Sequence, residues 1–336
     1  MADPADYGYA VSRLRAMENR LLDQGVYQRL LDSEDLPSAL KVMSETAYGK
    51  WFLEQQNENT FEPAIESELK HVYTETEQFV PDPCLYRIFR LPYDIHNIKV
   101  LLKGIFKQKQ GGQRRLDLLT SLGNIPVDDL VMAIESEDYR LMPFGFHRTV
   151  PESVSIWEQT HDILQVERIL DQALFSLQIK MADEVAFEGV KLFARSRVDT
   201  ENIRNVARLK RMGFDSSQAA PFLHNGGSVP VEKIQSLINE PYEGWERILS
   251  FADVSRTLSG AQDHADLDSL IVDLEKSIDD FLSWVLAKYK YSPFAPENVL
   301  HYLWMKETEA KNVRVLLIGI GNGAERTVLR RLLRNV

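Results

Sequence analysis

The feature that most constrains the fold is a polar pattern that occurs three times along the chain. Each copy has an acid, an asparagine three positions later, then isoleucine or valine, then lysine or arginine. The copies read DIHNIKVLLKG, DTENIRNVARL and EAKNVRVLLIG, and the residues that define them are Asp94, Asn97, Lys99, Asp199, Asn202, Arg204, Glu309, Asn312 and Arg314. The asparagines lie 105 and 110 residues apart. This period is far too long for a solenoid repeat of roughly 20–50 residues, and it predicts three related small domains.

Apolar residues recur around each copy at helical spacing. They stand nine and six positions before the acid and four and seven positions after it. These offsets lie close to one stripe of a helix with 3.6 residues per turn, and strand alternation would not produce them. In the order of the copies they are Leu85, Ile88, Ile98 and Leu101; Val190, Phe193, Ile203 and Val206; and Leu300, Leu303, Val313 and Leu316. An apolar-rich segment ending near Tyr48, Tyr139 or Tyr242 also accompanies each copy.

Helical periodicity dominates the rest of the chain as well. The proline-free region from about Val154 to Phe193 keeps a nearly continuous apolar stripe, which predicts a long helix, and a second long helix is expected from about Asp266 to Lys290. Proline and glycine cluster in short segments between such regions, which is typical of loops. No convincing alternating strand pattern occurs. The sequence therefore predicts an all-α protein.

The segment VRVLLIGIGNGAE near the C-terminus raises a different possibility. Gly319, Gly321 and Ala324 fit the G-x-G-x-x-A form of the dinucleotide-binding fingerprint. Such a site also requires a strand–turn–helix–strand unit and an acid about 20 residues later. Only twelve residues follow Ala324 in the sequence, and they read as one short amphipathic helix. We therefore interpret the glycines as the end of a helix and a turn, with a nucleotide-dependent enzyme as the less favoured alternative.

The repeated acid and asparagine themselves call for hydrogen-bond partners. On a helical wheel Asp94 lies near the apolar stripe and Asn97 on its flank, so both are expected to be half-buried. An unpaired buried polar group destabilises a protein by about 1–3 kcal/mol. We expect the partners to be backbone groups or arginine side chains of neighbouring helices. The functional alternative is a ring of three polar sites that face a shared partner.

Composition and missing motifs narrow the possible functions. The net charge of −11, from 39 basic and 50 acidic residues, argues against nucleic acid as the main partner, although three basic segments occur at Lys103–Arg115, Arg195–Arg211 and from Arg326 onward. The single Cys84 permits no disulfide within the chain and favours a reducing compartment. The polar N-terminus is unlike a secretory signal, and no stretch approaches the ~20 apolar residues of a membrane span. No metal spacing, phosphate loop or nucleophile elbow occurs, so we predict no catalytic, cofactor-binding or metal-binding residues.

The sequence resembles the C subunits of the archaeal and bacterial V-type (A-type) rotary ATPases, whose eukaryotic counterpart is the d subunit of the V-ATPase. The resemblance extends from about Tyr7 to the end of the chain. It is carried by YGYAVSRLRAMENRLL, TAYGKWF, PYDIHNIKVLLKG, DTENIRNVARLKR and KETEAKNVRVLLIG. The family offers no catalytic residue to transfer, and no residue is assigned to a partner contact. Trp51, Trp157 and Trp304 are candidate interface anchors, although core packing is the more common role of such residues.

The resemblance implies three similar helical domains arranged as a funnel with pseudo-threefold symmetry. The funnel would sit on the cytoplasmic face of the membrane rotor ring, peripheral and without a membrane span. Its cavity would receive the tip of the central stalk, formed by the D and F subunits, and the protein would carry rotation between the soluble head and the ion-moving ring. No cofactor and no nucleic acid is implied. A helical scaffold of another multiprotein assembly is the alternative, and nucleic-acid binding through Lys103–Arg115 and the arginine-rich tail is a further one.

We expect the domain boundaries to follow the repeat. The predicted lobes are 21–120, 121–215 and 216–336, and a helix at 7–24 is expected to pack against the last lobe. The segments 1–20 and 300–336 are therefore expected to lie together, which leaves the boundary between the first and third lobes open.

Overall fold

The computed structural model describes residues 3–54 and 61–335, and within these ranges it contains helices and connecting segments without a β-strand. The prediction of an all-α protein is confirmed for these residues. The longer helices are α1 (Tyr7–Glu18), α2 (Gln24–Leu31), α3 (Leu36–Ser44), α5 (Glu62–Glu77), α6 (Pro83–Lys109), α7 (Val127–Glu135), α8 (Phe146–Thr160), α9 (Ile163–Val185), α10 (Glu188–Arg211), α14 (Leu267–Ala287) and α15 (Glu297–Gly321). The shorter ones are α4 (Gly49–Glu54), α11 (Ser216–Ala219), α12 (Val231–Ser236), α13 (Trp245–Ile248) and α16 (Arg326–Leu332).

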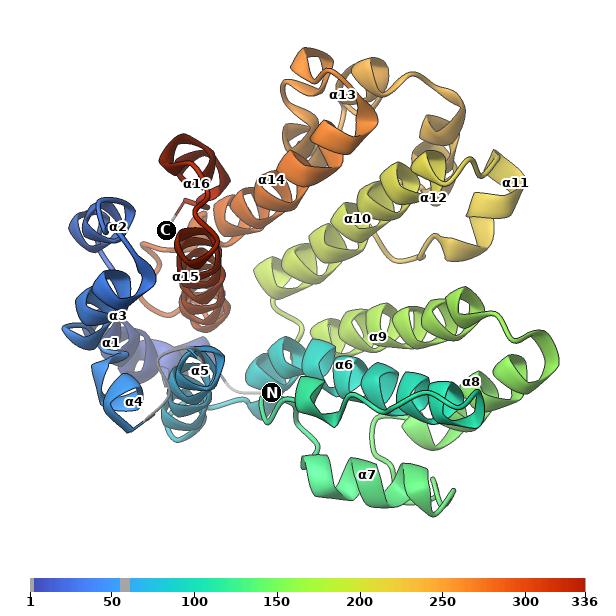
Figure 1. Ribbon diagram of the computed structural model, residues 1–336, viewed down its shortest axis with the longest axis horizontal. Helices are drawn as coiled ribbons and strands as arrows, with labels where there is room; N and C mark the ends of the chain where they lie inside the picture. Colours follow the sequence, from blue (N-terminus) through green and yellow to red (C-terminus); the bar gives the residue numbers. More distant parts are fainter. Residues whose placement is uncertain (1–2, 55–60, 336) are drawn as a thin grey trace.

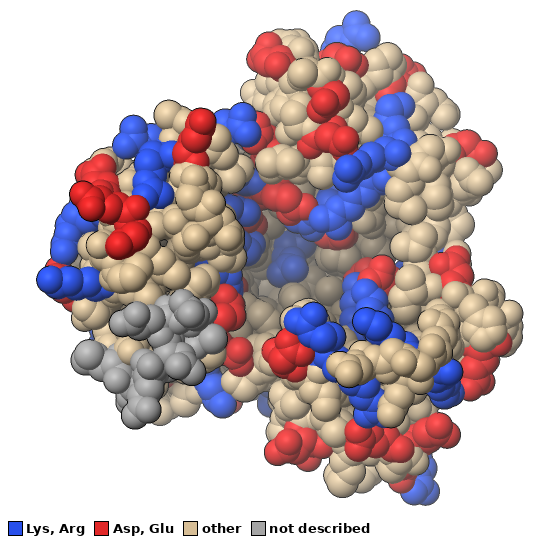
Figure 2. All heavy atoms as spheres, viewed as in Figure 1, with Lys and Arg blue, Asp and Glu red and all other residues tan. Residues whose placement is uncertain are grey.

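The helices form three groups arranged around the centre of the molecule (Figure 1). Helices α1 to α5 lie with α15 and α16 on one side, α6 to α9 form a second group, and α10 to α14 form a third. Helix α9 packs against α6, α8 and α10, helix α10 packs against α14, and α14 packs against α15. Figure 2 shows the same face hollowed at its centre, with lysine and arginine side chains in and around the hollow.

The three repeat segments lie inside the long helices α6, α10 and α15. All twelve apolar stripe residues predicted from the helical offsets are buried, none with more than 2% of its surface exposed. Burying such side chains contributes roughly 1.5–3 kcal/mol each relative to leaving them in water. The offsets therefore identify the core-facing side of each helix.

The region predicted as one long helix over Val154–Phe193 is divided into three helices, which corrects that prediction. Helix α8 ends at Thr160, where His161 adopts a left-handed conformation with φ of 52°. The side chain of Asp162 then accepts a hydrogen bond from the backbone N–H of Leu164 and begins α9. A second left-handed residue, Ala186 with φ of 64°, separates α9 from α10. Neither break contains glycine or proline, so the apolar stripe alone gave no sign of them.

The other long helix matches its prediction. Helix α14 spans Leu267–Ala287, close to the expected Asp266–Lys290.

The three repeat helices end in the same way. Helices α6, α10 and α15 are each followed within two residues by a glycine with positive φ: Gly111 (+83°), Gly213 (+79°) and Gly323 (+69°). In all three the glycine N–H bonds three residues back and the next N–H bonds five residues back, which is the Schellman arrangement.

The glycine-rich segment near the C-terminus is therefore the end of a helix and not the turn of a dinucleotide-binding unit. Gly319 and Gly321 are the last two glycines inside α15, and the chain turns at Gly323, which follows the helix. A Cβ atom on Gly319 would lie 2.2 Å from Leu329 Cδ2. Gly319 thus allows α16 to pack closely on α15.

Candidate functional site

Each of the three repeated asparagines holds a backbone segment that follows its helix. Asn97 donates a hydrogen bond to the Thr120 carbonyl (2.8 Å) and accepts one from the Thr120 N–H (2.9 Å). Asn202 forms the same two bonds with His224, at 2.8 and 2.7 Å, and Asn312 forms them with Arg334, at 3.0 and 2.8 Å. The partner lies 23, 22 and 22 residues downstream. We call these three contacts the asparagine clamps.

The acid of the first two copies holds a second point of the same connection. The Asp94 carboxylate accepts hydrogen bonds from the Ile125 N–H (2.9 Å) and the Asn124 side chain (2.7 Å). Asp199 accepts from the backbone N–H groups of Ser228 (2.9 Å) and Val229 (3.1 Å). Burial raises the pKa of both Asp94 and Asp199 to about 6, although these donors oppose the rise.

A glycine makes room for each of these aspartates. A Cβ atom on Gly123 would lie 2.4 Å from Asp94 Oδ1, and one on Gly227 would lie 2.1 Å from Asp199 Oδ1. Any larger residue would displace the carboxylate. Two similar segments in the sequence mark these loops, GNIP in the first copy and GSVP in the second. The sequence analysis did not recognise this similarity.

The third acid, Glu309, reaches a different part of the chain. Its carboxylate accepts hydrogen bonds from the Leu22 N–H (2.5 Å) and the Tyr48 hydroxyl (2.8 Å), and it lies 2.7 Å from Lys306 Nζ. Lys306 also pairs with Glu68 at 3.0 Å. The side chains of Glu68, Lys306 and Glu309 are all at least 96% buried. This buried charge cluster joins α15 to α5 and to the segments on either side of α2 and α3.

The basic residue of each copy forms an ion pair with a neighbouring helix. Lys99 lies 2.6 Å from Asp171 of α9. Arg204 binds Glu275 of α14 through two nitrogens, at 3.0 Å each. Arg314 lies 2.6 Å from Glu62 of α5. Helices α9, α14 and α5 thus occupy corresponding places beside α6, α10 and α15.

The repeated acids and asparagines point away from the surface. Asp94, Asn97, Asp199, Asn202, Glu309 and Asn312 all have at most 2% of their surface exposed. The acids and asparagines are more deeply buried than the expected half-burial. Downstream loops cover five of them, whereas Glu309 is enclosed by α5 and by the segments around Leu22 and Tyr48. Their observed partners are mainly backbone groups of those loops, with Lys306 and Tyr48 at Glu309.

The central hollow contains a cavity of about 300 Å³ at the place where α6, α9, α10, α14 and α15 approach each other. Its apolar lining includes Phe89, Tyr93 and Trp304, and its charged lining consists of Arg197, Glu201, Arg204, Asp279, Glu307 and Lys311. Aromatic and arginine side chains are enriched in surfaces that bind another protein. The hollow is therefore the candidate interaction surface.

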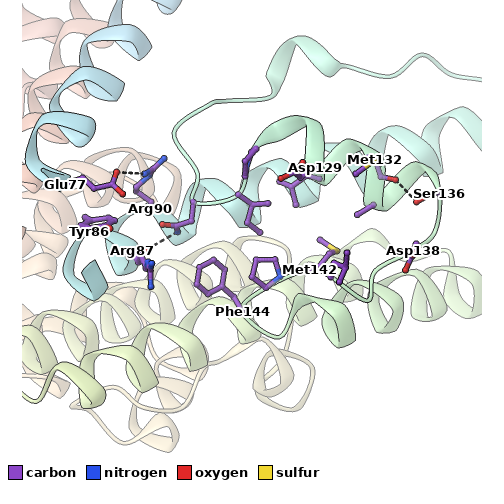
Figure 3. A pocket seen from close by; sticks show the side chains of 17 residues that line it. Glu77, Tyr86, Arg87, Arg90, Asp129, Met132, Ser136, Asp138, Met142 and Phe144 are labelled. Carbon is purple, nitrogen blue, oxygen red and sulfur yellow. Dashed lines mark hydrogen bonds and ion pairs between the residues drawn. The ribbon is translucent and has the colours of Figure 1, made fainter. Parts of the chain in front are cut away.

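A second, larger hollow lies to the side of the molecule, between the start of α6 and α7. This lateral groove has a volume of about 700 Å³ and is lined by Tyr86 and Arg87 of α6, Asp129 and Met132 of α7, and Met142 and Phe144 of the following segment (Figure 3). Met142 stands three residues after the landmark tyrosine of its copy, and Trp51 and Trp245 stand at the same place in the other copies. Trp245 is fully buried and donates to the Leu237 carbonyl at 2.9 Å. At this place in its own copy, the smaller side chain of Met142 lines the lateral groove.

The tryptophans named as candidate anchors are used inside the protein. Trp157 is 8% exposed and stacks on Phe106 with ring centroids 4.5 Å apart. Trp304 is 6% exposed and donates to Ser283 Oγ at 3.0 Å. Trp51 is half-buried and donates to Glu68 at 2.7 Å. Of the three, Trp304 alone also lines the central cavity.

Much of the basic character of the first two basic segments is balanced by carboxylates nearby. In the first, Lys103 pairs with Glu167 and Arg114 with Glu135. In the second, Arg204 and Arg208 share Glu275.

Cys84 is half-buried, and burial raises the pKa of its thiol, so the thiolate is disfavoured. Within residues 3–54 and 61–335 no three potential ligands gather in a way that could hold a metal ion, and no helix is both long and apolar enough to cross a bilayer.

Comparison with known proteins gives one family. The family model described as ATP synthase (C/AC39) subunit matches residues 10–332. The C subunit of the A-type ATP synthase of Methanocaldococcus jannaschii is 26% identical over 338 residues, which cover 94% of this chain and 83% of that protein. The C subunit of the V-type sodium ATPase of Enterococcus hirae is 22% identical, with 96% of each chain covered. The C subunit of the V-type ATP synthase of Thermus thermophilus is 24% identical, with 94% of each chain covered.

Proposed function

Because this chain belongs to the ATP synthase (C/AC39) subunit family, we propose that it is a non-catalytic rotor adaptor of a V-type or A-type ATPase. In this role it links a central stalk, built from subunits of the D and F type, to the rotor ring in the membrane. It transmits rotation that is coupled to ion transport, and it lies peripherally on the cytoplasmic face of the membrane. The names of the relatives support membership of such a complex.

The single observation that carries the adaptor role is the central hollow with three corresponding helices around it. Helices α6, α10 and α15 each contribute an asparagine clamp, an ion pair to a neighbouring helix and part of the lining of one cavity. A three-part wall of this kind supports a funnel with pseudo-threefold symmetry. A rotor adaptor has to resist torque, and long helices tied by buried hydrogen bonds and ion pairs provide that stiffness.

The contacts also support a specific grouping of the three units. We assign α6–α9 to the first, α10–α14 to the second, and α15 and α16 together with α1–α5 to the third. Helix α15 packs against α1, α3 and α5, whereas α6 packs chiefly against α9. This grouping starts the first two units at α6 and α10, near 83 and 188, instead of at 21 and 121 as predicted from the repeat period. It keeps the expected packing of the N-terminal helix against the last unit.

The proposal is tested by binding and by site-specific crosslinking. The purified chain is expected to bind stalk subunits of its own organism and to hydrolyse no ATP alone. A photo-crosslinking residue at position 311, in the lining of the hollow, is expected to capture a stalk subunit. The same residue at position 141, where the exposed Leu141 borders the lateral groove, serves as the matched control.

Three outcomes separate the possibilities. Crosslinking from position 311 but not from position 141 supports the stalk in the hollow. Capture from position 141 alone contradicts that location. Failure to bind either stalk or ring subunits, in a mild detergent extract where the rest of the complex assembles, contradicts the adaptor role and favours a scaffold of another assembly.

A further inference from the structure

One cation in the central hollow has no partner among the residues that the structure describes. Arg197 of α10 lines the cavity, and no described residue forms a hydrogen bond or ion pair with its guanidinium group. Its side chain is partly accessible to solvent, yet enough protein surrounds it that burial lowers its pKa. Accessibility combined with strong desolvation describes a group at the bottom of a concave surface.

The other charges around the cavity are already engaged. Arg204 is held by Glu201 and Glu275, and Lys311 lies 2.6 Å from Asp279. Asp279 also binds Arg334, at 3.0 Å. Glu201 and Asp279 of the cavity lining are thus already paired, although the charge of Glu201 still acts on Arg197.

The remaining acid of the cavity lining, Glu307, is also occupied. One of its oxygens accepts hydrogen bonds from the hydroxyls of Tyr73 and Tyr93. It lies too far from Arg197 to count as an ion pair, although its charge still acts on the arginine. The two residues stand two positions before the acids of their repeat copies, where the first copy has Pro92.

The comparison of the three copies shows that the fold does not require an arginine at this place. Proline, arginine and glutamate occupy corresponding positions on α6, α10 and α15, and all three line the same cavity. A partly desolvated cation without a partner lowers the stability of the protein that contains it. Such a residue is expected where a ligand of opposite charge completes the pair on binding.

We propose that Arg197 is the anchor for a carboxylate carried by the stalk segment that enters the central hollow. This inference rests on the proposed adaptor function and adds the chemistry of the contact. Guanidinium and carboxylate groups match in a bidentate geometry, and a water-poor cavity strengthens such a pair. Phe89, Tyr93 and Trp304 belong to the apolar lining of the same cavity.

The test compares two arginines on the same helix. Arg195 is exposed, and no described residue pairs with its side chain, so Arg195→Gln removes the same charge outside the cavity. Affinity for the purified stalk subunits is measured by calorimetric titration for the full-length chain and for Arg197→Gln, Arg197→Lys and Arg195→Gln. Arg197→Gln is expected to weaken binding at least tenfold, Arg197→Lys to weaken it less, and Arg195→Gln to change it less than twofold.

A stability measurement on the isolated chain distinguishes an anchor from a structural residue. The midpoint of thermal unfolding of Arg197→Gln is expected to equal or exceed that of the wild type, because no hydrogen bond or ion pair among the described residues is lost. A lower midpoint together with unchanged stalk affinity overturns the inference. Equal affinity of Arg197→Gln and wild type also overturns it and leaves the adaptor function intact, whereas absence of binding by the wild type overturns both.

Discussion

The units built on α6 and α10 differ from the unit built on α15 in where their acid finds its partners. Asp94 and Asp199 bind the loops about 30 residues downstream, so each connection closes within its own stretch of chain. Glu309 instead binds Leu22, 287 residues away in sequence, and shares Lys306 with Glu68. The first two units therefore use local hydrogen bonds, whereas the third depends on a buried charge cluster that joins distant parts of the chain. Contacts of such large sequence separation form late and slowly in folding.

The largest expected effect is on the buried charge cluster. Lys306→Met keeps the volume of the side chain but leaves the carboxylates of Glu68 and Glu309 buried without their cation. Breaking a buried ion pair in this way lowers the free energy of unfolding by about 3–5 kcal/mol. Urea unfolding followed by circular dichroism measures the loss. Lys311→Met, which breaks a partly exposed pair with Asp279, is the control and should lose much less. Equal losses in the two variants would contradict the special role of the cluster.

The aspartates of the first two units predict a pH dependence. Their pKa of about 6 in the folded protein lies above the ordinary value of 3.8, so the folded state holds these protons more tightly than the unfolded state. Each group therefore contributes stability at low pH that is lost as pH rises from about 4 to about 6, and the loss per group is at most about 3 kcal/mol.

The Asp94→Asn variant isolates this effect because asparagine does not titrate. The unfolding free energy of the wild type, minus that of Asp94→Asn, is expected to fall between pH 4 and pH 7. The measurement is a series of urea unfolding curves across this range. A difference that stays constant or rises with pH would show that the hydrogen bonds from Ile125 and Asn124 outweigh burial.

How much of this could be read from the sequence depends on the kind of residue. The helical offsets identified the core face of α6, α10 and α15 because burial repeats with the helix period. The helix breaks at His161 and Ala186 were not predicted, because a left-handed residue other than glycine cannot be recognised from its residue type. The partners of Asn97 and Glu309 could not be foreseen either. A polar residue on an apolar stripe predicts that it has a partner, but only the tertiary fold decides which backbone group supplies it.

The asparagine clamps should differ in strength according to the burial of the backbone they hold. Asn202 holds His224, which is 5% exposed, so the N–H and carbonyl freed by Asn202→Ala remain out of water. We expect a loss of about 2–3 kcal/mol for this variant. Thr120 and Arg334 are less deeply buried, and water can replace the side chain there. Asn97→Ala and Asn312→Ala should therefore lose about 1 kcal/mol each. The same urea titration ranks the three variants, and equal losses would show that burial of the loop is not the deciding factor.

The smallest effects concern the ion pairs that join corresponding helices. The pair between Arg314 and Glu62 is open to solvent on the Glu62 side, where 53% of the side chain is exposed. Exposed pairs of this kind contribute about 0–1 kcal/mol, and salt screens them. Arg204 binds Glu275 through two nitrogens and is less exposed, which favours a larger coupling energy.

Double-mutant cycles with alanine at both positions of each pair measure the two coupling energies. The measurements are made first in dilute buffer and then in about 1 M NaCl, where the screening length is only about 3 Å. The coupling between Arg314 and Glu62 should vanish in salt while that between Arg204 and Glu275 persists. Because Arg204 borders the hollow and Arg314 pairs with α5, the opposite order would mean that the third unit is held more firmly than the wall of α10.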